Sequence, residues 1–180
     1  MATPPDFTAG AVLTAAQMNK IGMWLIDRQV VGTAVSSVDF TSCFSGDFEN
    51  YRVHYIGNSA SASAAIILQL GTGSATTANY NSYLRTAYAT WGSLGTGQDA
   101  ITDGLHLCFA GTGMAGTLDI MAPNIAVPTY AYGGFGNSTN GGYIAGRQTD
   151  STAFTSAHIK ARSGTITGGS IAIYGYNSQT

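Results

Sequence analysis

Charged residues are scarce in this sequence. Only 9% of the 180 residues are charged, and the 7 Lys and Arg residues are scattered singly along the chain. Nucleic-acid binding needs a basic patch or stripe that displaces counterions from the phosphates. We therefore expect no nucleic-acid partner.

Long hydrophobic segments are also lacking. The longest apolar run, near residues 64–70, is far shorter than the roughly 20 residues that span a bilayer. The first six residues, Met-Ala-Thr-Pro-Pro-Asp, contain neither the basic nor the apolar stretch of a secretory signal. We expect a soluble protein without membrane insertion or a secretory signal.

Cysteine is represented only by Cys43 and Cys108, which are far apart and have apolar neighbours. In a protein made in the cytosol, such residues are more often buried as small hydrophobic side chains than joined in a disulfide. We expect both to be buried, and the sequence leaves open whether they pair. Disorder is excluded because the chain has 10 Tyr, 7 Phe and 2 Trp with a net charge of only −2.

Short segments with a period of two fill most of the chain. Glycine-rich clusters, such as 71–73, 133–134 and 140–142, lie between them and indicate turns. Many short strands without a second helical pattern predict an all-β domain over residues 27–180, an antiparallel β-sandwich or jelly-roll-like body. The strand-like segments are 52–56, 65–70, 105–109, 116–121, 156–161 and 170–176.

Residues 1–26 have a different pattern, which predicts an arm. Two adjacent prolines favour extended backbone, and Thr14 with Gln17 forms a capping box that starts a short helix over about 14–21. A helix of this length is unstable alone, so it must dock on its own domain or on a partner, and the sequence favours neither. The docking side chains would be Phe7, Leu13, Met18, Ile21 and Trp24.

No catalytic motif is surrounded by the secondary-structure pattern that its chemistry requires. Gly111, Gly113 and Gly116 match the spacing of a dinucleotide-binding loop, but a strand pattern follows where a helix is required. We interpret the segment as a hairpin loop. Asp99 and Asp103 are the one acidic pair worth inspecting for glycan hydrolysis, because the other carboxylates stand beside turn residues. We therefore expect no enzyme.

A metal site is not expected either. His106 and Cys108 share one strand face at a spacing that a metal ion could use, but nothing nearby completes a ligand set. The remaining histidines stand in the middle of strand patterns. We expect no metal and no cofactor.

Aromatic, amide and hydroxyl side chains gather in segments that the pattern indicates are loops. Rings with an apolar body and a polar edge suit sugars and protein surfaces. The alternative is that half of these rings cover the ends of the sandwich. The candidate residues for binding a host ligand are Tyr80, Tyr83, Tyr88, Trp91, Tyr130, Tyr132, Phe135 and Tyr143.

Residues 4–19, Pro-Pro-Asp-Phe-Thr-Ala-Gly-Ala-Val-Leu-Thr-Ala-Ala-Gln-Met-Asn, resemble the N-terminal signature of a group of small structural proteins of tailed bacteriophages. The resemblance continues through 24–26, 48–53 and the closing strand pattern at 169–176. It does not extend to the middle of the chain, about residues 80–148.

This resemblance implies a non-enzymatic virion protein on the particle surface, a homotrimer that docks on other phage virion proteins through its arm. One placement is a tail-associated fibre or tip component that presents loops to a host surface glycan or protein. The other is a capsid decoration protein that stabilises the head. The aromatic loops favour the tail. A carbohydrate-binding or carbohydrate-acting protein is the alternative from another class.

Overall fold

The computed structural model describes residues 22–90, 93–109 and 111–176, with the side chains of 87–90 and 93–99 left undescribed. The described residues form thirteen strands and no helix. The strands are β1 (Trp24–Val30), β2 (Ser37–Phe40), β3 (Asn50–Ala60), β4 (Ile66–Gly71), β5 (Tyr80–Thr90), β6 (Ser93–Ile101), β7 (Leu105–Cys108), β8 (Met114–Met121), β9 (Thr129–Gly136), β10 (Asn140–Gln148), β11 (Ser156–Ala161), β12 (Ile166–Thr167) and β13 (Ser170–Tyr176).

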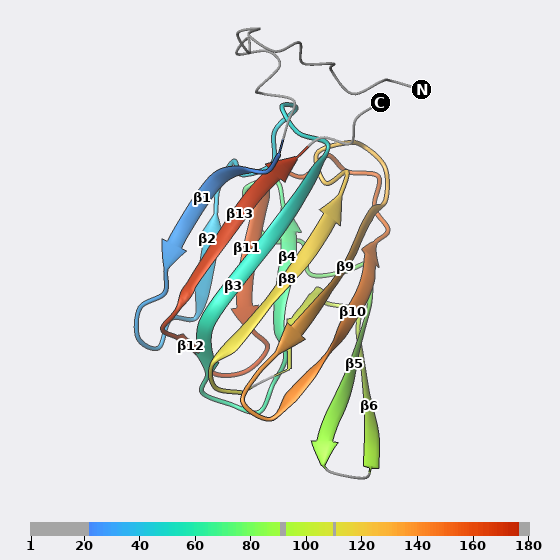
Figure 1. Ribbon diagram of the computed structural model, residues 1–180. Helices are drawn as coiled ribbons and strands as arrows, with labels where there is room; N and C mark the ends of the chain where they lie inside the picture. Colours follow the sequence, from blue (N-terminus) through green and yellow to red (C-terminus); the bar gives the residue numbers. More distant parts are fainter. Residues whose placement is uncertain (1–21, 91–92, 110, 177–180) are drawn as a thin grey trace, which may run out of the picture.

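The strands form two antiparallel sheets that lie face to face (Figure 1). The large sheet has nine strands in the order β1-β13-β3-β8-β9-β10-β5-β6, with β12 beside β3. The small sheet has the order β2-β11-β4-β7. The sequence prediction of an all-β, β-sandwich-like body with antiparallel pairing is therefore confirmed.

The core lies between the sheets and is built from alternate residues of each strand. In β3, Tyr51, Val53 and Tyr55 are buried, while the residues between them point away from the core. β4 is buried along its whole length, as its nearly continuous apolar sequence predicts, because a second cluster containing Ile67 and Ile101 covers its other side. The alternation leaves one face of the large sheet open to solvent.

Both cysteines are buried and carry free thiols. The prediction that they act as small hydrophobic side chains is confirmed. Burial raises the pKa of Cys43 and of Cys108 to about 12. Both thiols are therefore protonated near neutral pH and lack the thiolate needed for nucleophilic chemistry.

The predicted arm falls partly within the described residues. Residues 24–26 begin β1, where Trp24 pairs with Gly175 of β13. The predicted boundary after residue 26 thus falls inside a strand of the large sheet. The predicted helix at 14–21, together with Phe7, Leu13, Met18 and Ile21, lies outside the described residues.

The glycine clusters 133–134 and 140–142 lie within strands and are not turns, contrary to the sequence prediction. Gly133 lies inside β9 and Gly142 inside β10. The inward-facing ring of Phe135 stands in register between Gly116 and Gly142. A Cβ on Gly142 would lie 2.8 Å from that ring and would overlap the carbonyl oxygen of Arg85. These glycines make room for close packing, which a sequence pattern does not reveal.

The predicted hairpin at Gly111–Gly113 is also wrong. The segment leads from β7 of the small sheet to β8 of the large sheet, so it is a connection between sheets. The prediction that a strand follows the glycines is confirmed by β8.

Candidate functional site

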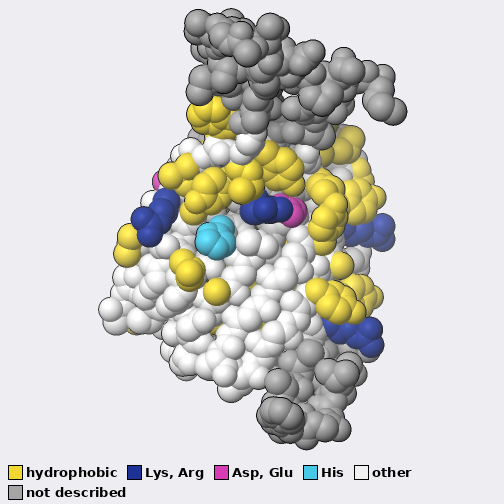
Figure 2. All heavy atoms as spheres, in the orientation of Figure 1, with side chains coloured by type: hydrophobic (Ala, Val, Ile, Leu, Met, Phe, Trp, Pro, Cys, Tyr) yellow, Lys and Arg dark blue, Asp and Glu magenta, His cyan; other side chains and the backbone are white. Residues whose placement is uncertain are grey.

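The outward-pointing side chains of the large sheet form rows that cross its strands. Figure 2 shows hydrophobic side chains gathered in a band across the upper half of this outer face, above a mostly uncharged surface. The cross-strand register defines one such row. In order across the sheet it contains Leu25, Tyr174, Arg52, Asp119, Tyr132, Ala145 and Tyr83.

Four exposed tyrosines lie together on β9, β10 and β5. We call Tyr83, Tyr130, Tyr132 and Tyr143 the tyrosine patch; their exposed fractions lie between 49% and 60%. Tyr132 and Tyr83 stand on either side of Ala145 in register. Adjacent strands are about 4.8 Å apart, so the two tyrosine backbones are separated by about 10 Å. The small alanine thus forms a floor between two rings.

The surface is hollowed beside this floor. A depression of about 310 Å³ is lined by Tyr83, Leu84, Arg85, Tyr143 and Ala145. Its volume is at the lower end of the range of about 300–1,000 Å³ found for ligand sites. The Arg85 guanidinium donates a hydrogen bond of 3.3 Å to the Tyr143 hydroxyl at this depression, so a cationic group and two rings meet there.

An ion pair separates the patch from the apolar residues near β1. Arg52 binds Asp119 through two hydrogen bonds of 2.7 Å, and the Tyr176 hydroxyl donates to the same carboxylate at 3.4 Å. The hydrogen bond with Asp119 raises the pKa of Arg52. Burial, and next the charge of Asp119, raise the pKa of Tyr176. The Arg52 charge is therefore neutralised within the protein.

Two of the eight predicted ligand-binding residues belong to the core. Tyr80 is buried and its hydroxyl accepts the Leu70 amide hydrogen at 2.8 Å; burial raises its pKa. Phe135 is also buried. Each stands three positions from a patch tyrosine on the same strand, and an odd spacing places two residues on opposite sheet faces. The prediction that they contact a ligand is wrong.

The other six predicted residues divide into two groups. The four patch tyrosines are exposed as predicted, but in strands and not in loops. The backbone of Tyr88 lies in β5, and its side chain and Trp91 lie outside the described residues. Sequence reasoning missed Arg85, Ala145 and Arg147. The alternation of these residues with buried ones would have revealed them, had 80–90 and 140–148 been interpreted as strands.

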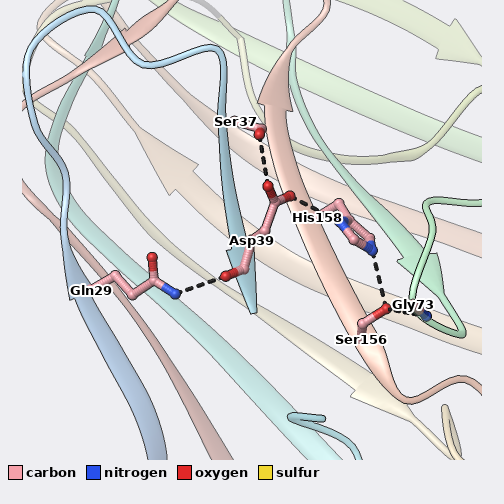
Figure 3. A network of polar contacts seen from close by, with 6 residues as sticks. All are labelled: Gln29, Ser37, Asp39, Gly73, Ser156 and His158. Atoms are coloured by element: carbon pink, nitrogen blue, oxygen red, sulfur yellow. Dashed lines mark hydrogen bonds and ion pairs between the residues drawn. The ribbon is translucent and has the colours of Figure 1, made fainter. Parts of the chain in front are cut away.

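A second polar arrangement lies on the small sheet (Figure 3). Ser156 Oγ is 3.0 Å from His158 Nε2, and His158 Nδ1 is 2.8 Å from Asp39 Oδ1. This is the order of groups in a hydrolase triad. The serine, however, is only 1% exposed, and its hydroxyl accepts the Gly73 amide hydrogen at 3.3 Å. A nucleophile must reach its substrate, so this arrangement serves to join β2, β11 and the turn after β4.

Replacing His158 by alanine tests this structural role. We expect the free energy of unfolding to fall by about 1–2 kcal/mol, because the buried Ser156 hydroxyl loses its partner. Urea unfolding followed by tyrosine fluorescence measures the change. Ser156→Ala in the same background should not restore the loss, since it also removes the acceptor of the Gly73 amide hydrogen. Ester hydrolysis by the wild type that Ser156→Ala abolishes would contradict the structural role.

Two pairs are candidates from the sequence, Asp99 with Asp103 for catalysis and His106 with Cys108 for a metal ion. Asp103 binds Arg162 at 3.1 Å, and the side chain of Asp99 lies outside the described residues. His106 and Cys108 are both buried. Within the described ranges no three His, Cys, Asp or Glu side chains are grouped to hold a metal ion. The same ranges contain no helix with the length and hydrophobicity to cross a membrane.

Comparison with known proteins gives no relative. No protein-family model matches the chain, and a search of curated proteins finds no significant match. The assignment of function therefore depends on the residues and their arrangement.

Proposed function

We propose that this protein is a non-enzymatic structural component of a bacteriophage particle, a tail-associated homotrimer that binds the host surface through the tyrosine patch. The observation that carries the adhesive role is the cluster of four exposed tyrosines on one open sheet face. Exposed aromatic residues on a rigid sheet bind with little loss of conformational entropy. The resemblance of residues 4–19 to phage structural proteins supports the placement on a virion.

The proposed docking region lies at the start of β1. Met23, Trp24 and Leu25 are large exposed hydrophobic residues, and they lie at the C-terminal end of the predicted arm, which includes Trp24 among its predicted docking residues. β1 is an edge strand of the large sheet. An apolar edge strand offers both unpaired backbone groups and hydrophobic surface to a partner. We therefore place the contact with other virion proteins here and in the arm.

Met23→Ser combined with Leu25→Ser tests the docking region. We expect incorporation into particles to fall by at least about tenfold, because two side chains that become buried on docking are lost. The melting temperature should change little, since both residues are exposed in the free protein. Quantitative immunoblotting of purified particles measures incorporation.

Val30→Ser is the matched control. Val30 lies at the other end of the same strand and, among the described side chains, is the most exposed large hydrophobic residue, at 77%. We expect normal incorporation of this variant. Normal incorporation of the Met23→Ser/Leu25→Ser protein would contradict docking through the start of β1.

A capsid decoration protein is the second candidate. It is favoured by the continuity of the outer row from Leu25 to Tyr83, which crosses seven neighbouring strands of the large sheet. A sheet face of this extent suits contacts between subunits of a shell. In a decoration protein the tyrosine patch would be buried against the head, so substitutions in it would reduce incorporation and leave adsorption to cells unchanged.

A further inference from the structure

We propose that the tyrosine patch selects an acidic polysaccharide, with anionic groups of the polymer bound by Arg85 and Arg147. This inference rests on the proposed host-binding function and names its ligand class. The first observation is an excess of positive charge beside the patch. Both arginines point outward beside the patch, Arg85 on β5 and Arg147 on β10, in a protein whose net charge is −2.

The two arginines lack anionic partners among the described side chains. Arg85 donates to the neutral hydroxyl of Tyr143, and Arg147 makes no ion pair with a described carboxylate. Two other arginines are ion-paired, since Arg52 binds Asp119 and Arg162 binds Asp103, whereas Arg28 on β1 donates to the Ser170 hydroxyl. The patch therefore presents two cationic groups that are free to bind an anion.

The register fixes how these groups surround the floor at Ala145. Arg147 and Tyr143 stand two residues away from Ala145 along β10, in opposite directions, at about 7 Å each. Arg147 is opposite Tyr130 on one side, and Tyr143 is opposite Arg85 on the other. Each arginine thus lies next to a tyrosine, and the two arginines are at opposite corners of the patch.

This arrangement matches an acidic polymer better than a single acidic sugar. Sugar rings can lie against the tyrosine rings, which offer an apolar surface with a polar edge. A guanidinium binds a carboxylate, sulfate or phosphate through two parallel hydrogen bonds. Because the arginine backbones are separated by about 14 Å across the patch, they engage anionic groups on different residues of one chain. A neutral glycan would leave both cations unpaired.

The test measures binding of the full-length protein to alginate, dextran sulfate and neutral dextran by biolayer interferometry. We expect at least one acidic polymer to bind at least about tenfold more tightly than dextran, with affinity falling as salt increases. Alginate and dextran sulfate distinguish carboxylate from sulfate as the preferred anion. Failure to bind either acidic polymer, or equal binding of neutral dextran, overturns the inference.

Arg85→Gln combined with Arg147→Gln identifies the residues responsible. We expect a loss of about a hundredfold in affinity for the acidic polymer, about tenfold for each charge-assisted contact. Arg28→Gln is the control. Arg28 also lies on the outer face, on β1, five strand spacings or about 24 Å from β10. Its variant should bind normally. Unchanged affinity of the double variant, or an equal loss for Arg28→Gln, overturns the inference.

Host-cell binding separates this inference from the proposed function. If Tyr83→Ala/Tyr132→Ala loses cell binding while Arg85→Gln/Arg147→Gln retains it, the patch binds the host through an uncharged ligand, and only the inference fails. If both variants bind cells as the wild type does, the proposed adhesive function fails as well.

Discussion

Replacing Tyr83 and Tyr132 by alanine should reduce binding of the purified protein to host cells by about a hundredfold. The two rings stand on either side of the Ala145 floor, where a ligand would contact both. Truncating an aromatic residue that contributes to an interface costs more than about 1 kcal/mol, and each 1.4 kcal/mol is about a factor of ten, so two rings together account for about a hundredfold. Flow cytometry with fluorescently labelled protein measures the loss.

The same variant should fold normally. Both side chains are about half exposed or more, so their removal should shift the melting temperature by no more than about 2 °C. Ile56→Ala is the control, because Ile56 is exposed on the outer face of β3 outside the patch. It should bind cells as the wild type does. Unchanged binding of the tyrosine variant would favour the capsid decoration role.

The second large effect concerns the packing beneath the patch. Gly142→Ala should lower the free energy of unfolding by about 3 kcal/mol, the upper range for overpacking a core. The new Cβ would overlap the backbone carbonyl of Arg85, which cannot move without disturbing the pairing of β10 with β5. For a domain of this size the melting temperature should fall by about 6–12 °C. Thermal unfolding followed by circular dichroism measures the shift.

Gly141→Ala is the matched control in the same strand. A Cβ at Gly141 would meet only the carbonyl oxygen of Phe135, at an ordinary contact distance of 3.6 Å. This variant should unfold within about 1 kcal/mol of the wild type. An equal loss of stability in the two variants would contradict the role of the space beside Phe135, because the change in unfolded-state entropy alone favours alanine.

Several strands follow directly from the sequence, whereas others do not. β3 and β11 alternate apolar and polar residues, and β4 is nearly continuously apolar, so their pattern alone predicts them. β9 and β10 carry glycines in their interiors. These glycines leave room for the Phe135 ring and for the close approach of neighbouring backbones. Both requirements arise from the tertiary structure and are not visible in the sequence of a single strand.

The sequence predicted which types of residue form the site, but it did not predict how they are arranged. Composition alone drew attention to Tyr83, Tyr130, Tyr132 and Tyr143. The core positions of Tyr80 and Phe135 depend on which sheet face each residue occupies, and that requires knowing that the segments are strands. Arg85 and Arg147 stand alone in the sequence, and only the register of β5 with β10 places them around one floor.

The most direct test of the proposed function is the location of the protein on intact particles. Immunogold labelling with an antibody against the purified protein, viewed by electron microscopy, gives this location. We predict label confined to the tail, with the antibody blocking adsorption to host cells. Label over the head would contradict the tail placement and support capsid decoration. Particles without label would contradict a virion role altogether.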